Sequence, residues 1–102
     1  MQLDFTGRTY VVTGGGSGIG KGVAAGLVRA GADVMIVGRN ADRLSAAAEE
    51  IAADAPGRVL AGPADVTDED QVAGVVGDAT AWNGRLHDVV HCAGGSETIG
   101  PI

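Results

Sequence analysis

Short apolar runs alternate with longer segments of helical periodicity along the whole chain, and this alternation limits the folds open to it. Four runs, at residues 8–13, 33–37, 58–61 and 87–92, predict strands. Their apolar residues follow one another instead of alternating with polar ones, so we expect both faces of the sheet to be covered. Such strands, separated by helices, form parallel βαβ units with right-handed crossovers. The predicted fold class is therefore α/β.

Capping residues and glycines set the expected limits of the three helical segments. The first segment ends at Gly31. Asn40 is the expected N-cap of the second. Thr67 is expected to start the third, which would place acidic residues in the first turn, where the helix dipole favours them. The apolar residues of the first segment are Ile19, Val23, Leu27 and Val28, and the acids of the third are Asp68, Glu69 and Asp70.

Composition narrows the classes of partner. A chain of 102 residues is one domain or a piece of one. Its formal net charge of −6 argues against a nucleic-acid or acidic-membrane partner. The longest apolar stretches fall short of the ~20 residues that span a bilayer, so no membrane partner is expected. The single cysteine, Cys92, cannot form an internal disulfide and favours a cytoplasmic location.

A glycine-rich loop, residues 13–20, joins the first predicted strand to the first helix. Glycine suits a tight turn there, and it lets the backbone approach a pyrophosphate group that a Cβ would keep away. The amino end of the helix adds free N–H donors and a partial positive charge. A phosphotransferase P-loop is an alternative, because Gly15, Gly20 and Lys21 match its spacing. However, Gly22 stands where that motif needs a hydroxyl for Mg²⁺.

The loop resembles the T-G-x-x-x-G-I-G fingerprint of the short-chain dehydrogenase/reductase family. All five specified positions are matched, by Thr13, Gly14, Gly18, Ile19 and Gly20. The resemblance implies that the loop binds a dinucleotide cofactor. The cofactor-binding candidates in it are Gly14, Gly16, Ser17, Gly18, Ile19 and Gly20.

The same resemblance implies the architecture. It predicts a Rossmann-type, doubly wound parallel sheet whose four strands are ordered 3-2-1-4, with the glycine loop at the carboxyl edge. The second half of such a sheet would be incomplete here. Residues 1–102 are therefore expected to form the N-terminal part of a single NAD(P)-binding domain.

Gly38-Arg39, at the end of the second predicted strand, bears on the choice of cofactor. In the dinucleotide fold a carboxylate at this place accepts from the ribose hydroxyls of NAD, whereas an arginine accommodates the 2′-phosphate of NADP. Gly38 leaves nothing to repel a phosphate, and Arg39 offers a guanidinium that fits one. NADP is thus the expected cofactor. NAD stays possible, because Ser17 stands where NADP-using relatives often carry a second basic residue, and Arg39 could be a solvated strand-end side chain.

Two further pairs match the family. Asp65-Val66 corresponds to the pair that holds adenine, although Asp65 could instead cap the next helix. Ala93-Gly94 matches the end of the family's Asn-Asn-Ala-Gly and is expected beside the cofactor ribose. His91 and Cys92 depart from that pattern. Strand alternation puts these two on opposite faces, so no metal site is expected, and His91 is interpreted as buried and hydrogen-bonded.

The family transfers hydride between NAD(P)(H) and a carbonyl or alcohol, using a Ser, a Tyr and a Lys, the last two as Y-x-x-x-K. Here Gly14 stands four residues after Tyr10, and the single lysine is Lys21. No catalytic residue can be assigned, so the chain is expected to stop before them and to be inactive alone. A non-catalytic nucleotide-binding module is the alternative. The uncovered edge of the fourth strand favours pairing with another copy, so a homo-oligomer is expected.

Overall fold

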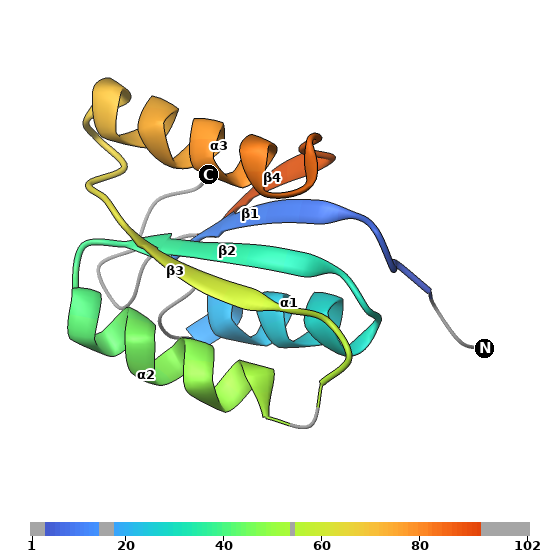
Figure 1. The fold of residues 1–102 in the computed structure, drawn as a ribbon. Coiled ribbons are helices and arrows are strands. Elements are labelled where there is room, and N and C mark those ends of the chain that lie inside the picture. The colour runs from blue at the N-terminus through green and yellow to red at the C-terminus, as the bar shows by residue number, and fades with distance from the viewer. Residues whose placement is uncertain (1–3, 15–17, 54, 93–102) are drawn as a thin grey trace.

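One sheet of four parallel strands carries a helix in each of its three connections. The computed structural model describes residues 4–14, 18–53 and 55–92. In chain order the elements are β1 (Thr9–Thr13), α1 (Gly18–Arg29), β2 (Asp33–Gly38), α2 (Ala41–Ala52), β3 (Val59–Pro63), α3 (Glu69–Asn83) and β4 (Asp88–His91). The sheet order is β3-β2-β1-β4, and every pairing is parallel (Figure 1). The predicted fold class and strand order are both confirmed.

Each face of the sheet has its own helical layer, because alternate residues of the central strands point to opposite sides. On one face Val12 and Ile36 pack against α1 and α2, and on the other Val11 and Met35 lie on the side of α3 (Figure 1). All five residues of β1 are buried, as expected for a strand covered on both faces. Burying one such aliphatic side chain contributes about 1.5–3 kcal/mol, which makes β1 and β2 the stable centre of the fold.

Helix α1 packs through smaller residues than the sequence predicted. Its buried positions are Gly20, Ala24 and Val28, spaced four apart along one face. Ile19, expected on that face, is 76% exposed. Val28 is buried as expected, and Val23 and Leu27 are partly buried against the same core. Small side chains at Gly20 and Ala24 let the helix backbone lie close to the strands.

Helix α3 begins two residues later than predicted. Its N-cap is Asp68, whose carboxylate accepts from the backbone N–H groups of Asp70 and Gln71. Thr67 therefore does not start the helix, and only Glu69 and Asp70 remain as acids of the first turn. The prediction for α2 is confirmed, since Asn40 accepts from the N–H of Arg43 at 2.9 Å.

A polar network closes the amino edge of the sheet, where the strands begin. Arg58 makes a bidentate ion pair with Asp33, with Nε 3.1 Å from Oδ1 and Nη2 2.7 Å from Oδ2. Asn83, the last residue of α3, donates to Asp33 at 2.7 Å and to the hydroxyl of Thr9 at 2.8 Å. The Arg58 guanidinium also lies 4.8 Å from the centre of the Trp82 ring. The network thus ties the carboxyl end of α3 to the start of β1 and β2.

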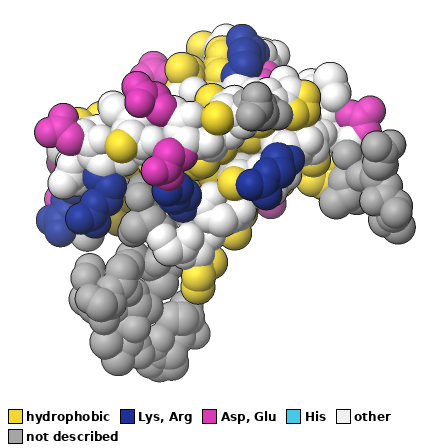
Figure 2. Space-filling model, turned by 90° about the horizontal axis from the view of Figure 1, so that it is seen from below, with side chains coloured by type: hydrophobic (Ala, Val, Ile, Leu, Met, Phe, Trp, Pro, Cys, Tyr) yellow, Lys and Arg dark blue, Asp and Glu magenta, His cyan; other side chains and the backbone are white. Residues whose placement is uncertain are grey.

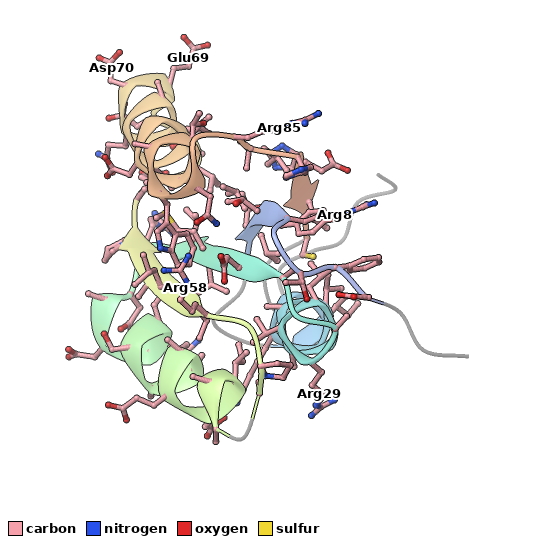
Figure 3. The ribbon with its side chains drawn as sticks, turned by 45° about the vertical axis from the view of Figure 1, so that its right-hand side comes forward. Arg8, Arg29, Arg58, Glu69, Asp70 and Arg85 are labelled. Carbon is pink, nitrogen blue, oxygen red and sulfur yellow. The ribbon has the colours of Figure 1, made fainter. Side chains whose placement is uncertain are left out.

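This network sets the charge state of its carboxylate. The hydrogen bonds from Arg58 hold the pKa of Asp33 below its ordinary value, against the opposing effect of burial, and Asn83 adds to the lowering. Figure 3 shows Arg58 turned in against the sheet, whereas Arg29 and Arg85 point away from it. Arg58 is therefore a structural arginine, unlike those two.

The outer face of α1 and α2 is of mixed character. Basic side chains lie there in separate groups among acidic and apolar ones (Figure 2). Of the helices in the described part of the chain, none combines the length and apolar character that crossing a bilayer requires.

Candidate functional site

A hollow of about 290 Å³ opens at the carboxyl edge of the sheet. Residues at or just after the ends of all four strands line it: Thr13, Gly14, Gly38, Arg39, Ala64, Asp65, Val66, Thr67 and Cys92. The chain order of the strands reverses between β1 and β4, and open parallel sheets bind ligands at the carboxyl side of such a switch point. The hollow therefore lies where this fold places a ligand.

The glycine loop begins at Gly14, whose backbone lies close to both the end of β2 and the residue after β4. Gly14 has a φ of 75°, in the left-handed region that favours glycine, and an added Cβ would lie 2.8 Å from the carbonyl oxygen of Cys92. Its N–H donates to the carbonyl of Val37 at 2.8 Å. Of the other predicted loop residues, Gly18 begins α1 with a φ of 59°, whereas Gly16 and Ser17 lie outside the described residues.

The first turn of α1 faces the same edge. Gly18, Ile19 and Gly20 begin this helix, whose first N–H groups have no partner within it. Lys21 follows them but forms an ion pair with Glu50 of α2 and does not line the hollow. A P-loop lysine would point to the phosphates, so the geometry does not favour the phosphotransferase alternative.

Arg39 and Asp65 line one hollow although they follow different strands. The Asp65 carboxylate accepts from the hydroxyl of Thr67 at 2.7 Å and from its N–H at 2.9 Å. These bonds, with a smaller contribution from the charge of Arg39, hold the pKa of Asp65 below its ordinary value. Asp65 does not cap α3, because Asp68 does. Val66, 50% exposed, also lines the hollow.

The end of β4 differs from its interpretation in one respect. His91 is exposed, not buried, because β4 is an edge strand of the described sheet. It is hydrogen-bonded as expected, with Nδ1 3.3 Å from the hydroxyl of Thr13. Cys92 packs with Val90 on the face of α1. Within residues 4–14, 18–53 and 55–92, no three potential metal ligands gather. Ala93 and Gly94 lie outside the described residues.

The donors and acceptors around the hollow suit a nucleotide. The guanidinium of Arg39 matches a phosphate, the carboxylate of Asp65 accepts from amino or hydroxyl groups, and exposed Val66 offers an apolar contact to a base. The amino end of α1 adds a partial positive charge for a pyrophosphate. The residues present therefore fit a dinucleotide.

The sequence of residues 8–101 matches the profile of the family described as short chain dehydrogenase. The chain belongs to this family. It is 39% identical to the 3-ketodihydrosphingosine reductase gsl-3 of Neurospora crassa, over 95% of this chain and 28% of that protein. A short-chain type dehydrogenase/reductase from Mycobacterium ulcerans is 63% identical, with a TM-score of 0.85 over 98% of this chain and 37% of the other. The L-sorbose reductase of Gluconobacter frateurii, solved with NADPH and L-sorbose, is 32% identical and also has a TM-score of 0.85, over 98% of this chain and 38% of that one.

As a short-chain dehydrogenase chain, this sequence has the family's fold. It spans between 28% and 38% of the length of the three proteins named above. Tyr10 is buried inside β1 and Lys21 is paired with Glu50, so neither residue lies at the hollow.

Sequence reasoning missed two contributors. The sequence predicts only a helix start at Thr67, yet its hydroxyl orients the carboxylate of Asp65. The sequence indicates Thr13 only as the end of a strand and the first position of the glycine motif, yet its hydroxyl contacts the end of β4. Threonines beside a glycine loop and beside a conspicuous aspartate were the available signal, since both hydroxyls sit next to predicted site residues.

Proposed function

We propose that this chain is the N-terminal, cofactor-binding part of an NADP(H)-dependent oxidoreductase whose substrate is a carbonyl compound or an alcohol. The observation that carries the proposal is the shared hollow, which brings Arg39 and Asp65 to the loop that starts at Gly14. When bound, the nicotinamide supplies or accepts the hydride. The chain's own residues bind and orient the dinucleotide.

Each predicted site residue has a role in this proposal. The loop and first turn of α1 hold the pyrophosphate, through Gly14, Gly16, Ser17, Gly18, Ile19 and Gly20. Asp65 accepts from the adenine amino group, and Val66 packs against the ring. Ala93 and Gly94 let the backbone pass close to the cofactor ribose. Arg39 binds the 2′-phosphate, which makes NADP preferred over NAD.

The cofactor preference is tested with Arg39→Ala. Loss of a charge-assisted contact worth about 1.5–3 kcal/mol should raise the Kd for NADPH by roughly ten- to a hundredfold and leave the Kd for NADH nearly unchanged. Arg29→Ala is the matched control, because Arg29 points away from the fold and its loss changes the net charge equally (Figure 3). Equal losses for NADPH and NADH would show that Arg39 does not read the phosphate.

Catalysis is assigned to residues that follow Ile102 in the complete protein. The coding sequence downstream should contain Y-x-x-x-K within about one domain's length. The 102-residue chain alone should transfer no hydride, because neither Tyr10 nor Lys21 lies at the hollow. Its uncovered β4 edge should also pair with other copies, giving dimers or larger species on a sizing column. A sharp monomer with a cooperative melt, and no downstream motif, would favour a non-catalytic binding module instead.

A further inference from the structure

Two histidines mark the two ends of β4, and both imidazoles face β1. His87 precedes the strand and accepts from the N–H of Thr9, with Nδ1 at 3.0 Å. His91 ends the strand, with Nδ1 3.3 Å from the hydroxyl of Thr13. Within the described residues β4 has four residues and one neighbouring strand. These two side-chain links therefore hold both ends of a short edge strand.

The partner of each imidazole limits the direction of its hydrogen bond. A backbone N–H only donates, so Nδ1 of His87 is an acceptor and the ring proton sits on Nε2. At the other end, the hydroxyl of Thr13 accepts from the N–H of Cys92 at 3.3 Å. Its own proton has two acceptors, Nδ1 of His91 at 3.3 Å and the carbonyl of Val90 at 3.5 Å. When the hydroxyl donates to Nδ1 of His91, the ring proton of His91 also lies on Nε2. In the other tautomer Nδ1 donates to the hydroxyl, which then donates to the carbonyl of Val90.

The two links lie at opposite edges of the sheet. Thr9, which pairs with His87, begins β1 beside the network of Asp33 and Asn83. Thr13, which pairs with His91, immediately precedes Gly14 and lines the hollow. Fixing the Thr13 side chain fixes the backbone from which the glycine loop departs.

We propose that His91 is a positioning residue for the cofactor loop, acting through Thr13, whereas His87 only stabilises the strand. The inference rests on the proposed cofactor function of this edge. In the proposed arrangement the Thr13 hydroxyl donates to Nδ1 of His91, which links the end of β4 to the residue before Gly14.

Binding and stability measured on the full-length protein separate the two histidines. His91→Leu should raise the Kd for NADPH by about five- to tenfold, the loss of one hydrogen bond. His91→Asn should restore the Kd to within about twofold, since its amide oxygen can take the place of Nδ1. His87→Leu is the matched control and should lower the urea midpoint of unfolding without changing the Kd. Equal Kd changes in the two leucine variants, or none in His91→Leu, would overturn the proposal.

A second readout does not depend on the cofactor. Long-range ¹H–¹⁵N spectra of the imidazoles should show both rings protonated on Nε2. Thr13→Val should change the tautomer signals of His91 and leave those of His87 unchanged. Unaltered His91 signals would overturn the link to Thr13. Failure of the unsubstituted protein to bind any nicotinamide nucleotide would overturn the proposed function, and the spectra would still decide whether His91 accepts from Thr13.

Discussion

The amino and carboxyl edges of the sheet use their polar groups in opposite ways. At the amino edge the carboxylate of Asp33, in a residue only 9% exposed, is bound by Arg58 and Asn83. At the carboxyl edge Arg39 and Asp65 line an open hollow. The described residues contain two ion pairs, Arg58–Asp33 and one between α1 and α2, and neither lies in that hollow.

This difference separates stability from binding. Hydrogen bonds between two groups of the protein contribute to the free energy of unfolding. Polar groups that face a hollow contribute instead to the free energy of binding, when a ligand becomes their hydrogen-bond partner. Substitutions at the amino edge should therefore lower stability and leave nucleotide affinity unchanged. Substitutions of residues that line the hollow at the carboxyl edge should lower nucleotide affinity and leave stability nearly unchanged.

The largest expected effect is at Gly57, in the turn before β3. A Cβ added there would overlap the carbonyl oxygen of Ala32, so Gly57→Ala should lower the free energy of unfolding by about 3 kcal/mol. Gly26→Ala is the control, because Gly26 lies in α1 with open space around it. That variant should gain about 0.5–1 kcal/mol. Urea titrations measure both, and equal midpoints would contradict the prediction.

Next in size is Asp33→Ala, which removes the acceptor shared by Arg58 and Asn83. We expect a loss of about 2 kcal/mol, limited by the partial exposure of Arg58, with no change in the Kd for NADPH. Asp78→Ala, on the exposed side of α3, should stay within about 0.5 kcal/mol of the parent protein. A changed Kd in Asp33→Ala would show that the two edges are coupled.

Acid should weaken the interaction of the Asp33 carboxylate with Arg58 and Asn83. The pKa of Asp33 is lower in the folded protein than its ordinary value of 3.8, because Arg58 and Asn83 stabilise the ionised form. Its contribution is therefore complete above pH 3.8 and is lost as the pH falls through the lower, folded value. The difference in unfolding free energy between the parent protein and Asp33→Asn should shrink in that range. A difference that stays constant into strong acid would contradict the assignment.

The smallest change in stability is expected at Thr67, on the carboxyl edge. Thr67→Val removes the hydroxyl that orients Asp65 and should raise the Kd for NADPH about two- to fivefold. Stability should stay within about 0.5 kcal/mol, because Thr67 is exposed. Thr80→Val is the control, since its hydroxyl bonds within α3 to the carbonyl of Val76. An unchanged Kd in Thr67→Val would remove Thr67 from the site.

The sheet was predictable because local sequence carries its signal. The apolar runs around Val11 and Ile36 show buried strands without knowledge of their neighbours. Their order followed from resemblance to a known family, since spacing alone does not say which strand lies beside which. The family resemblance also placed Arg39 and Asp65 after the ends of their strands, and these two residues line one hollow in the structure.

The errors have separate physical causes: competing caps before α3, close packing of α1 against the sheet, and the place of β4 at an edge of the described sheet. Asp65, Thr67 and Asp68 can each cap a helix, and in the structure Asp68 accepts from N–H groups of the first turn of α3. Bulk at Ile19 suggested a buried position, but close approach to the sheet favoured small side chains. The pairing of Arg58 with Asp33 joins residues 25 positions apart, and no local pattern reveals it.

The pairing of β1 with β4 also bears on when the hollow forms during synthesis. Thr13 and His91 are register partners although 78 positions separate them in sequence. Closing so long a segment has an entropic cost before its contacts form, and parallel sheets with such distant pairings fold slowly. The nascent chain can pair β1 with β2 early. The side of the hollow that Cys92 lines can form only after the chain up to Cys92 has left the ribosome. Affinity for the nucleotide should therefore appear late and abruptly as the chain lengthens.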